Sequence, residues 1–108
     1  MLEPGLDRHE WESEWQALEE QVADAPAEAL SDLDDLVARL LDARGFAVDD
    51  PVVSEGDDPE ILAEFRAARE TTRLVDAGAD GISPGDVAAA VNGYRAVYEH
   101  LIAERSAP

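Results

Sequence analysis

Apolar residues recur at helical spacing along most of this chain, and the clearest run extends from Ser83 to Glu104. Ser83 is a natural N-cap, Pro84 suits the first helical turn, and the Asp86 carboxylate follows where it meets the positive end of a helix. One apolar stripe then continues at spacings of four, three, four and three residues: Val87, Val91, Tyr94, Tyr98 and Leu101. This pattern predicts a helix with a broad apolar circumference, which we expect to be central in the fold.

A second helix is predicted at the beginning of the chain, from Leu6 or Asp7 to Asp24. Asp7 is the expected cap, with Glu10 three residues later as in a capping box. Its apolar seam is narrow and resembles that of a coiled coil: Trp11, Trp15, Leu18, Val22 and Ala25. Two tryptophans one turn apart favour core packing, and a partner-binding face is the alternative.

Two more helices are predicted in the middle of the chain. The first covers Pro26 to Ala43, with a later start at Ser31 as the fallback, and the second covers Pro59 to Ala77, where Gly78 stops it. Residues 45–59 form the long connection between them, which we expect to be held on the bundle by its own apolar side chains. Leu74 falls opposite the apolar stripe of its helix and is therefore a candidate subunit contact.

The expected architecture is all-α: a single helical domain over residues 1–108, built as a four-helix bundle with the longer loop between helices 2 and 3. Residues on the shared apolar faces are expected to form the core, and these are Trp15, Leu18, Leu33, Val37, Leu40, Phe65, Tyr94 and Leu101.

Charge changes the interpretation of this bundle. The chain has 26 acidic residues against eight arginines and no lysine, and its net charge is −18. Repulsion on this scale opposes the compact state in dilute buffer, whereas molar salt reduces the Debye length to about 3 Å. The composition resembles that of the acidic, lysine-poor proteins of salt-in haloarchaea. That resemblance implies adaptation to high salt; an acidic protein from a GC-rich mesophile is the alternative.

The same charge disfavours two classes of partner. Nucleic acid and anionic membranes would both be repelled by most of the surface. The first residues lack the basic and apolar segments of a signal peptide, and the longest purely apolar run, Val87 to Val91, is too short to span a bilayer. We therefore expect a cytoplasmic protein. The chain has no cysteine, which excludes disulfides and thiolate metal sites.

Three arginines on one side of the third helix are the main candidates for ligand binding: Arg66, Arg69 and Arg73. Guanidinium groups suit phosphate or carboxylate, so an anion site is one hypothesis. The alternative is that these arginines pair with acidic residues on a neighbouring helix or a second subunit.

Other chemistry has weaker signals. Asp76, Asp80 and Asp86 are spaced somewhat like a calcium loop, but Gly78 and Val87 stand where acidic ligands are needed. His9 and His100 have no second histidine or cysteine nearby and are interpreted as surface residues. The sequence predicts no catalytic residue, no metal site and no cofactor.

One family resemblance adds an enzymatic alternative. The segment EALSDLDDLVARLL, with Asp32 and Asp35 as a pair, is similar to the second metal-bearing helix of MazG-type all-α nucleotide pyrophosphohydrolases. The resemblance implies a magnesium-dependent hydrolase. It covers one helix, and the preceding helix lacks the E-x-x-E pair of that family, because Ala23 stands three residues after Glu20.

The leading hypothesis is a small cytoplasmic interaction protein that associates with itself or with a protein partner. A homodimer is expected because large apolar residues exceed what one core needs. The interface candidates are Trp11, Leu74, Tyr94 and Tyr98.

Overall fold

A computed structural model describes residues 4–43 and 59–106, and they form four α-helices. These helices are α1 (Pro4–Asp24), α2 (Pro26–Ala43), α3 (Pro59–Asp76) and α4 (Pro84–Ser106). Each helix begins at a proline, whose fixed φ angle and missing N–H suit the first helical position. The all-α four-helix bundle with its longer loop between α2 and α3 is confirmed. The predicted contacts of that loop lie outside the described residues.

The predicted start of α1 was wrong by two or three residues. The helix begins at Pro4, so Asp7 lies inside the helix and is not its N-cap. A proline determines this start as it does the other three, and the cap-like spacing of Asp7 and Glu10 has no terminus to act on. The fallback start of α2 at Ser31 is likewise not used, because that helix begins at Pro26.

The connection between α3 and α4 has the predicted signals at both ends. At the end of α3, Gly78 has a φ of 72°, and the N–H of Ala79 donates to the carbonyl of Leu74 at 3.0 Å, which closes a Schellman motif. At the start of α4, the Asp86 N–H donates to Ser83 Oγ at 3.1 Å and the Ser83 N–H donates to Asp86 Oδ2 at 3.0 Å. This reciprocal pair is a capping box with aspartate in the third position.

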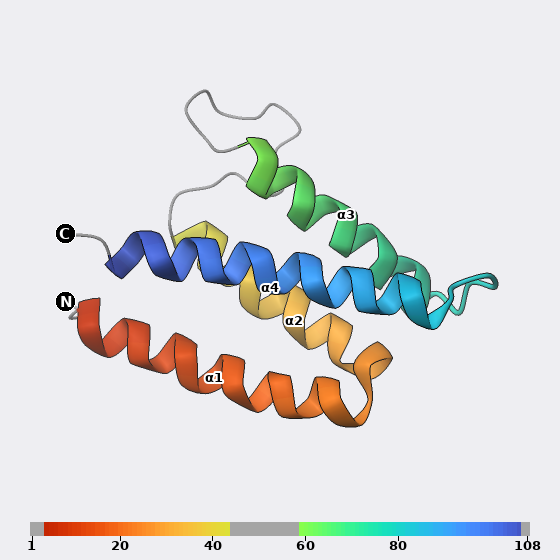
Figure 1. Cartoon of the computed structure of the whole chain (residues 1–108), viewed down its shortest axis with the longest axis horizontal. Helices are drawn as coiled ribbons and strands as arrows, with labels where there is room; N and C mark the ends of the chain where they lie inside the picture. The colour runs from red at the N-terminus through yellow and green to blue at the C-terminus, as the bar shows by residue number, and fades with distance from the viewer. Residues whose placement is uncertain (1–3, 44–58, 107–108) are drawn as a thin grey trace.

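The helices are arranged around a central pair. α2 packs against α1, α3 and α4, and α4 packs against α2 and α3. Figure 1 shows α1 and α3 on opposite sides of α4, with α2 behind it. Both short connections lie at one end of the bundle, while the start of α1 and the end of α4 lie at the other (Figure 1). The central position expected for α4 is thus shared with α2.

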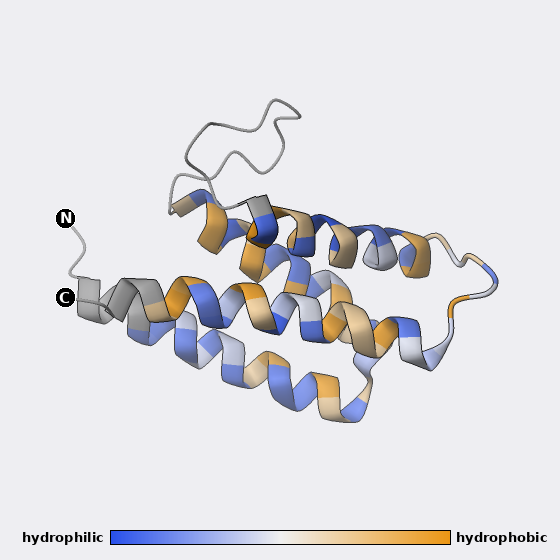
Figure 2. Ribbon diagram, turned by 45° about the horizontal axis from the view of Figure 1, so that its top comes forward, coloured by the Kyte–Doolittle hydropathy of each residue, from blue (hydrophilic) through white to orange (hydrophobic). Residues whose placement is uncertain are grey.

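The core forms where the apolar stripes of the four helices meet. Hydrophobic and hydrophilic positions succeed one another along each helix, as Figure 2 shows. All eight predicted core residues are buried, and so are Leu36 and Ala68. α3 and α4 approach closely at Gly93, where a Cβ atom would lie 3.4 Å from that of Ala68. The missing side chain of Gly93 thus lets α4 pack closely on Ala68 of α3.

None of the described helices combines the length and apolar character that a bilayer crossing requires.

Candidate functional site

A cluster of polar side chains joins three helices within the apolar core. Asp34 comes from α2, Arg69 and Thr72 from α3, and Tyr94 from α4; we call these four residues the polar node. Tyr94 is fully buried, and its hydroxyl donates a hydrogen bond of 2.7 Å to Oδ2 of Asp34. The Thr72 hydroxyl lies 2.6 Å from that of Tyr94. The node therefore supplies partners to polar groups that would be costly to bury alone.

The direction of the hydrogen bonds in the node follows from counting protons. An ionised Asp34 can only accept, so the single hydroxyl proton of Tyr94 points to it. The single Thr72 proton then serves two acceptors, the Tyr94 oxygen at 2.6 Å and the Ala68 carbonyl, to which the Thr72 hydroxyl donates at 3.0 Å. Burial raises the pKa of the Tyr94 hydroxyl far above its ordinary value, and the adjacent Asp34 carboxylate acts in the same direction.

Arg69 completes the node from the solvent side. Its Nε and Nη2 atoms donate to Oδ2 and Oδ1 of Asp34, both at 3.2 Å, in the bidentate geometry that guanidinium and carboxylate favour. The guanidinium carbon lies 4.9 Å from the centre of the Phe65 ring. Asp34 thus receives three hydrogen bonds, and this saturation leaves it poorly suited to act as a general base.

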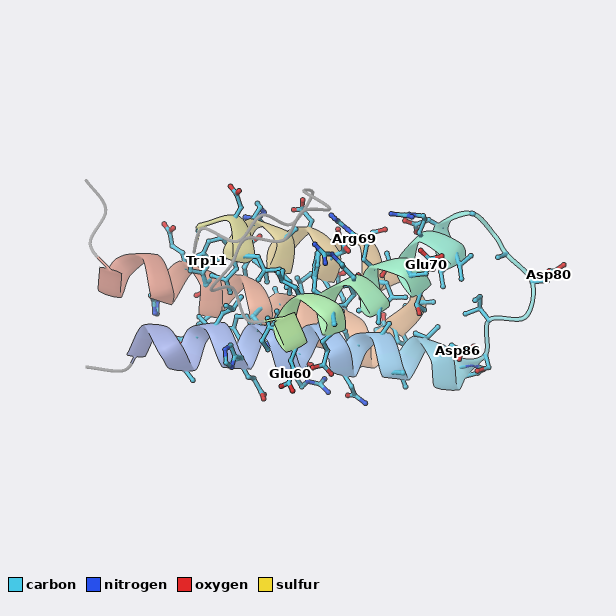
Figure 3. All side chains as sticks on the ribbon, turned by 90° about the horizontal axis from the view of Figure 1, so that it is seen from above. Trp11, Glu60, Arg69, Glu70, Asp80 and Asp86 are labelled. Atoms are coloured by element: carbon cyan, nitrogen blue, oxygen red, sulfur yellow. The ribbon has the colours of Figure 1, made fainter. Side chains whose placement is uncertain are left out.

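A small cavity opens beside the node, between α2 and α3. Its volume is about 220 Å³, and it is lined by Asp34, Arg69 and Thr72 of the node together with Ser31, Arg73 and Asp76. Ser31 donates a 2.8 Å hydrogen bond to Asp76 across the two helices. Figure 3 shows where Arg69 and its neighbour Glu70 lie along α3. Arg73 reaches Glu70 at 3.5 Å, a long contact between two largely exposed side chains.

The three predicted anion-binding arginines are therefore not equivalent. Arg69 pairs with an acidic residue of the neighbouring helix, as the alternative interpretation held. Arg73 lines the mouth of the same cavity, whereas Arg66 is half-buried and does not line it. Two carboxylates share the cavity with two guanidinium groups, so its lining carries no net charge.

The four interface candidates separate into two groups. Tyr94 and Tyr98 are both buried within the single chain, and the Tyr98 ring stacks on Trp15 with the ring centres 4.2 Å apart. Trp11 is half-buried beneath the guanidinium of Arg39. Leu74 is 37% exposed. Trp11 and Leu74 therefore remain as interface candidates, because the two tyrosines have almost no surface that a partner could contact.

Ion pairs hold α1 to its neighbours. Arg39 on α2 lies 2.6 Å from Glu14 and 3.1 Å from Asp35. Arg95 on α4 donates two hydrogen bonds to Glu19, which lower the pKa of that carboxyl. Together with the contacts of Arg69 and Arg73, these pairs neutralise positive charge within the chain. Acidic residues outnumber arginines, so the remaining carboxylates give the surface a net negative charge.

The acidic residues that the sequence suggested as metal ligands are not brought together in the part of the chain that the structure describes. Asp32 and Asp35, which the hydrolase resemblance would pair as ligands, both lie on the exposed side of α2. Asp80 is at the outer tip of the connection between α3 and α4, apart from Asp86 (Figure 3). Within residues 4–43 and 59–106, no three His, Cys, Asp or Glu side chains are grouped so that they can hold an ion.

A larger and more apolar groove lies at the end of the bundle that carries the two short connections. Its volume is about 460 Å³, and Glu28 is the charged residue in its lining. The remaining walls come from the α1–α2 connection, the start of α2, the α3–α4 connection and the start of α4, and include Ala25, Pro26, Ile82, Pro84, Val87 and Ala88. All of its other lining residues are uncharged, although the chain as a whole carries a net charge of −18.

Sequence reasoning missed Asp34 as a member of the site. A usable signal was present, since Asp34 stands four residues after Leu30 and three before Val37, on the apolar face of the helix. A carboxylate on such a face requires a partner, but its identity depends on which helices become neighbours.

Comparison with known proteins adds no family to this description: no family model matches the sequence, and no curated protein or solved structure shows significant similarity.

Proposed function

We propose that this chain is a small helical interaction protein of a salt-rich cytoplasm, and that it pairs with a second copy of itself. The observation that carries the proposal is that Leu74, in the last turn of α3, and the groove both belong to the end of the bundle with the two short connections. Leu74 is an exposed large hydrophobic side chain, and the groove of about 460 Å³ can accept a side chain of that size.

A protrusion and a hollow on one end of a molecule are what a twofold dimer uses. In such an isologous interface, a residue of one copy contacts a second residue of its partner, and the reverse contact follows by symmetry. Leu74 of each copy would enter the groove of the other, between Ile82 and Ala88. The last turn of α3 and the first turn of α4 would form the surrounding contact.

Salt determines whether this association can occur. Each chain carries a net charge of −18, and four of the described arginines already bind carboxylates of the same chain. Two copies therefore repel one another in dilute buffer. At molar ionic strength, screening within about 3 Å removes most of this repulsion, and the apolar contact remains. The high-salt, cytoplasmic setting is part of the proposal for this reason.

Substitutions at the apolar end test the proposal. Leu74→Asp and Ala88→Glu each place a charge where the partner would pack, and we expect both variants to have the mass of one chain by light scattering in molar KCl. Ala103→Glu is the matched control, because Ala103 is exposed near the opposite end of the bundle and should leave the dimer intact. If the wild type and all three variants have the same mass, the proposed interface is wrong.

Cysteine pairing gives a second, more local test. The chain has no cysteine, so each introduced thiol is unique. We expect a mixture of Leu74→Cys chains and Ala88→Cys chains to form a disulfide-linked pair in molar KCl faster than either variant forms one alone. Equal rates of cross-linking in the mixture and in the separate samples would argue against insertion of Leu74 into the groove.

A further inference from the structure

The cavity between α2 and α3 has the features of a binding site for a small molecule. Three residues of the polar node, Asp34, Arg69 and Thr72, line it, and two hydrogen-bonded contacts join its α2 and α3 walls. These are the bidentate pair of Arg69 with Asp34 and the hydrogen bond from Ser31 to Asp76. The α2 and α3 walls are therefore joined before any ligand arrives, which reduces the entropy cost of binding.

The charges of the lining restrict the class of ligand. A simple anion would meet Asp34 and Asp76, and a simple cation would meet Arg69 and Arg73. A molecule that carries both charges a few ångströms apart can place its anionic group on an arginine and its cationic group on an aspartate, and so avoids both repulsions. The volume of about 220 Å³ is below the usual range for drug-sized ligands and suits a molecule of a few heavy atoms.

The groups at the mouth of the cavity differ in how fully they are engaged. Arg69 and Asp34 satisfy each other inside the node. Arg73 is 71% exposed and its contact with Glu70 is 3.5 Å long, so it can turn to a ligand at little cost. Asp76 accepts one hydrogen bond from Ser31 and lies in the last residue of α3, where the helix dipole favours a cation.

We propose that this cavity binds a small zwitterion of the α-amino acid class, with its carboxylate on Arg73 and its ammonium on Asp76. Residues three apart on a helix have Cβ atoms about 5–6 Å from one another, a span that a ligand with adjacent opposite charges can bridge. Two simultaneous contacts at hydrogen-bond distance also survive molar salt, because they lie within the Debye length of about 3 Å.

Titration with three small probes tests the ligand class. Glycine carries both charges, acetate only the negative one and methylammonium only the positive one. We expect glycine to give saturable shifts of the backbone amide signals around Ser31 and Arg73 at constant molar KCl, with affinity at least about tenfold above either single-charge probe. Glycine that binds no better than acetate, or that produces no saturable shift, would overturn the proposal.

Substitutions at the mouth test the assigned roles. Arg73→Gln and Asp76→Asn should each weaken glycine binding by about tenfold, since each removes one charge-assisted hydrogen bond. Glu70→Gln should strengthen it, because Arg73 loses its competing partner; a merely structural role for Arg73 predicts no such gain. Unchanged affinity in all three variants contradicts the proposal. Arg73 and Asp76 lie in the last turn of α3 beside Leu74, so the titrations are also made on Leu74→Asp chains, which separates this result from the proposed dimer.

Discussion

The Tyr94 hydroxyl donates a 2.7 Å hydrogen bond to Oδ2 of Asp34, which lies 60 residues earlier in the chain. This bond joins the two central helices, α4 and α2, inside a core that is otherwise apolar. Thr72 of α3 binds the same hydroxyl at 2.6 Å, so one oxygen atom contacts groups from two other helices. The relative positions of three helices therefore depend on this tyrosine.

Tyr94→Phe should destabilise the fold by about 1–3 kcal/mol, because it leaves Thr72 and the half-buried Asp34 each without one partner. Urea unfolding in molar KCl measures this loss. Thr72→Val should reduce the free energy of unfolding more than Thr71→Val, because Thr72 is buried in the node and Thr71 is half-exposed. The opposite order would mean that the node is unimportant for stability. A Tyr94→Phe variant as stable as the wild type would contradict the role assigned to the node.

Alkaline pH should destabilise the protein through the same residue. An unfolded tyrosine ionises near pH 10, whereas burial raises the folded pKa of Tyr94 well above that value. The unfolded state therefore releases its proton first, and stability falls as pH rises above about 10. Unfolding free energies measured across this range should fall more steeply for the wild type than for Tyr94→Phe. Parallel curves for the two proteins would exclude Tyr94 as the source.

The two tryptophans of α1 should differ in their contribution to stability. Trp15 is 7% exposed and stacks on Tyr98 with the ring planes 5° apart, so Trp15→Ala should cost about 3–5 kcal/mol. Trp11 is half-buried, and its contact with Arg39 is a cation–π interaction worth about 0.5–1 kcal/mol at an exposed site. Trp11→Ala should therefore cost clearly less in the same denaturation experiment. Equal losses would mean that α1 packs differently from the structure.

Salt should stabilise the fold strongly if the acidic surface is an adaptation to high ionic strength. The thermal midpoint should rise steeply between low and molar KCl, because screening reduces the repulsion within a chain of charge −18. A double variant, Asp32→Asn with Asp42→Asn, removes two exposed carboxylates from α2 and should depend less on salt. A thermal midpoint that is flat across this range would refute the adaptation.

Local signals in the sequence were sufficient for most of the architecture. The capping box of Ser83 and Asp86 and the stop at Gly78 depend on residues only a few positions apart, and both were found as predicted. Periodicity likewise identified the buried face of each helix, down to Leu74 on the outside of α3. Asp7 was misassigned because its cap-like spacing was preferred to the proline three residues earlier.

The candidate sites were harder to predict, since they depend on which helices meet. Asp34 stands on an apolar face, but only the packing of α2 against α3 and α4 brings Arg69 and Tyr94 to it. The apolar groove likewise combines the α1–α2 connection with Ile82 and Val87, which lie more than 50 residues further along the chain. The helical period predicts which face of a helix a side chain occupies, but it does not predict which helix will pack against that face.

The mass of the wild-type protein as a function of KCl concentration tests the central proposal most directly. Light scattering should give the mass of two chains in molar KCl and should approach that of one chain as the salt is removed. The transition should disappear in Leu74→Asp, which is expected to remain a single chain throughout. A wild-type protein with the mass of one chain at every KCl concentration would contradict the proposal that it acts by pairing with itself.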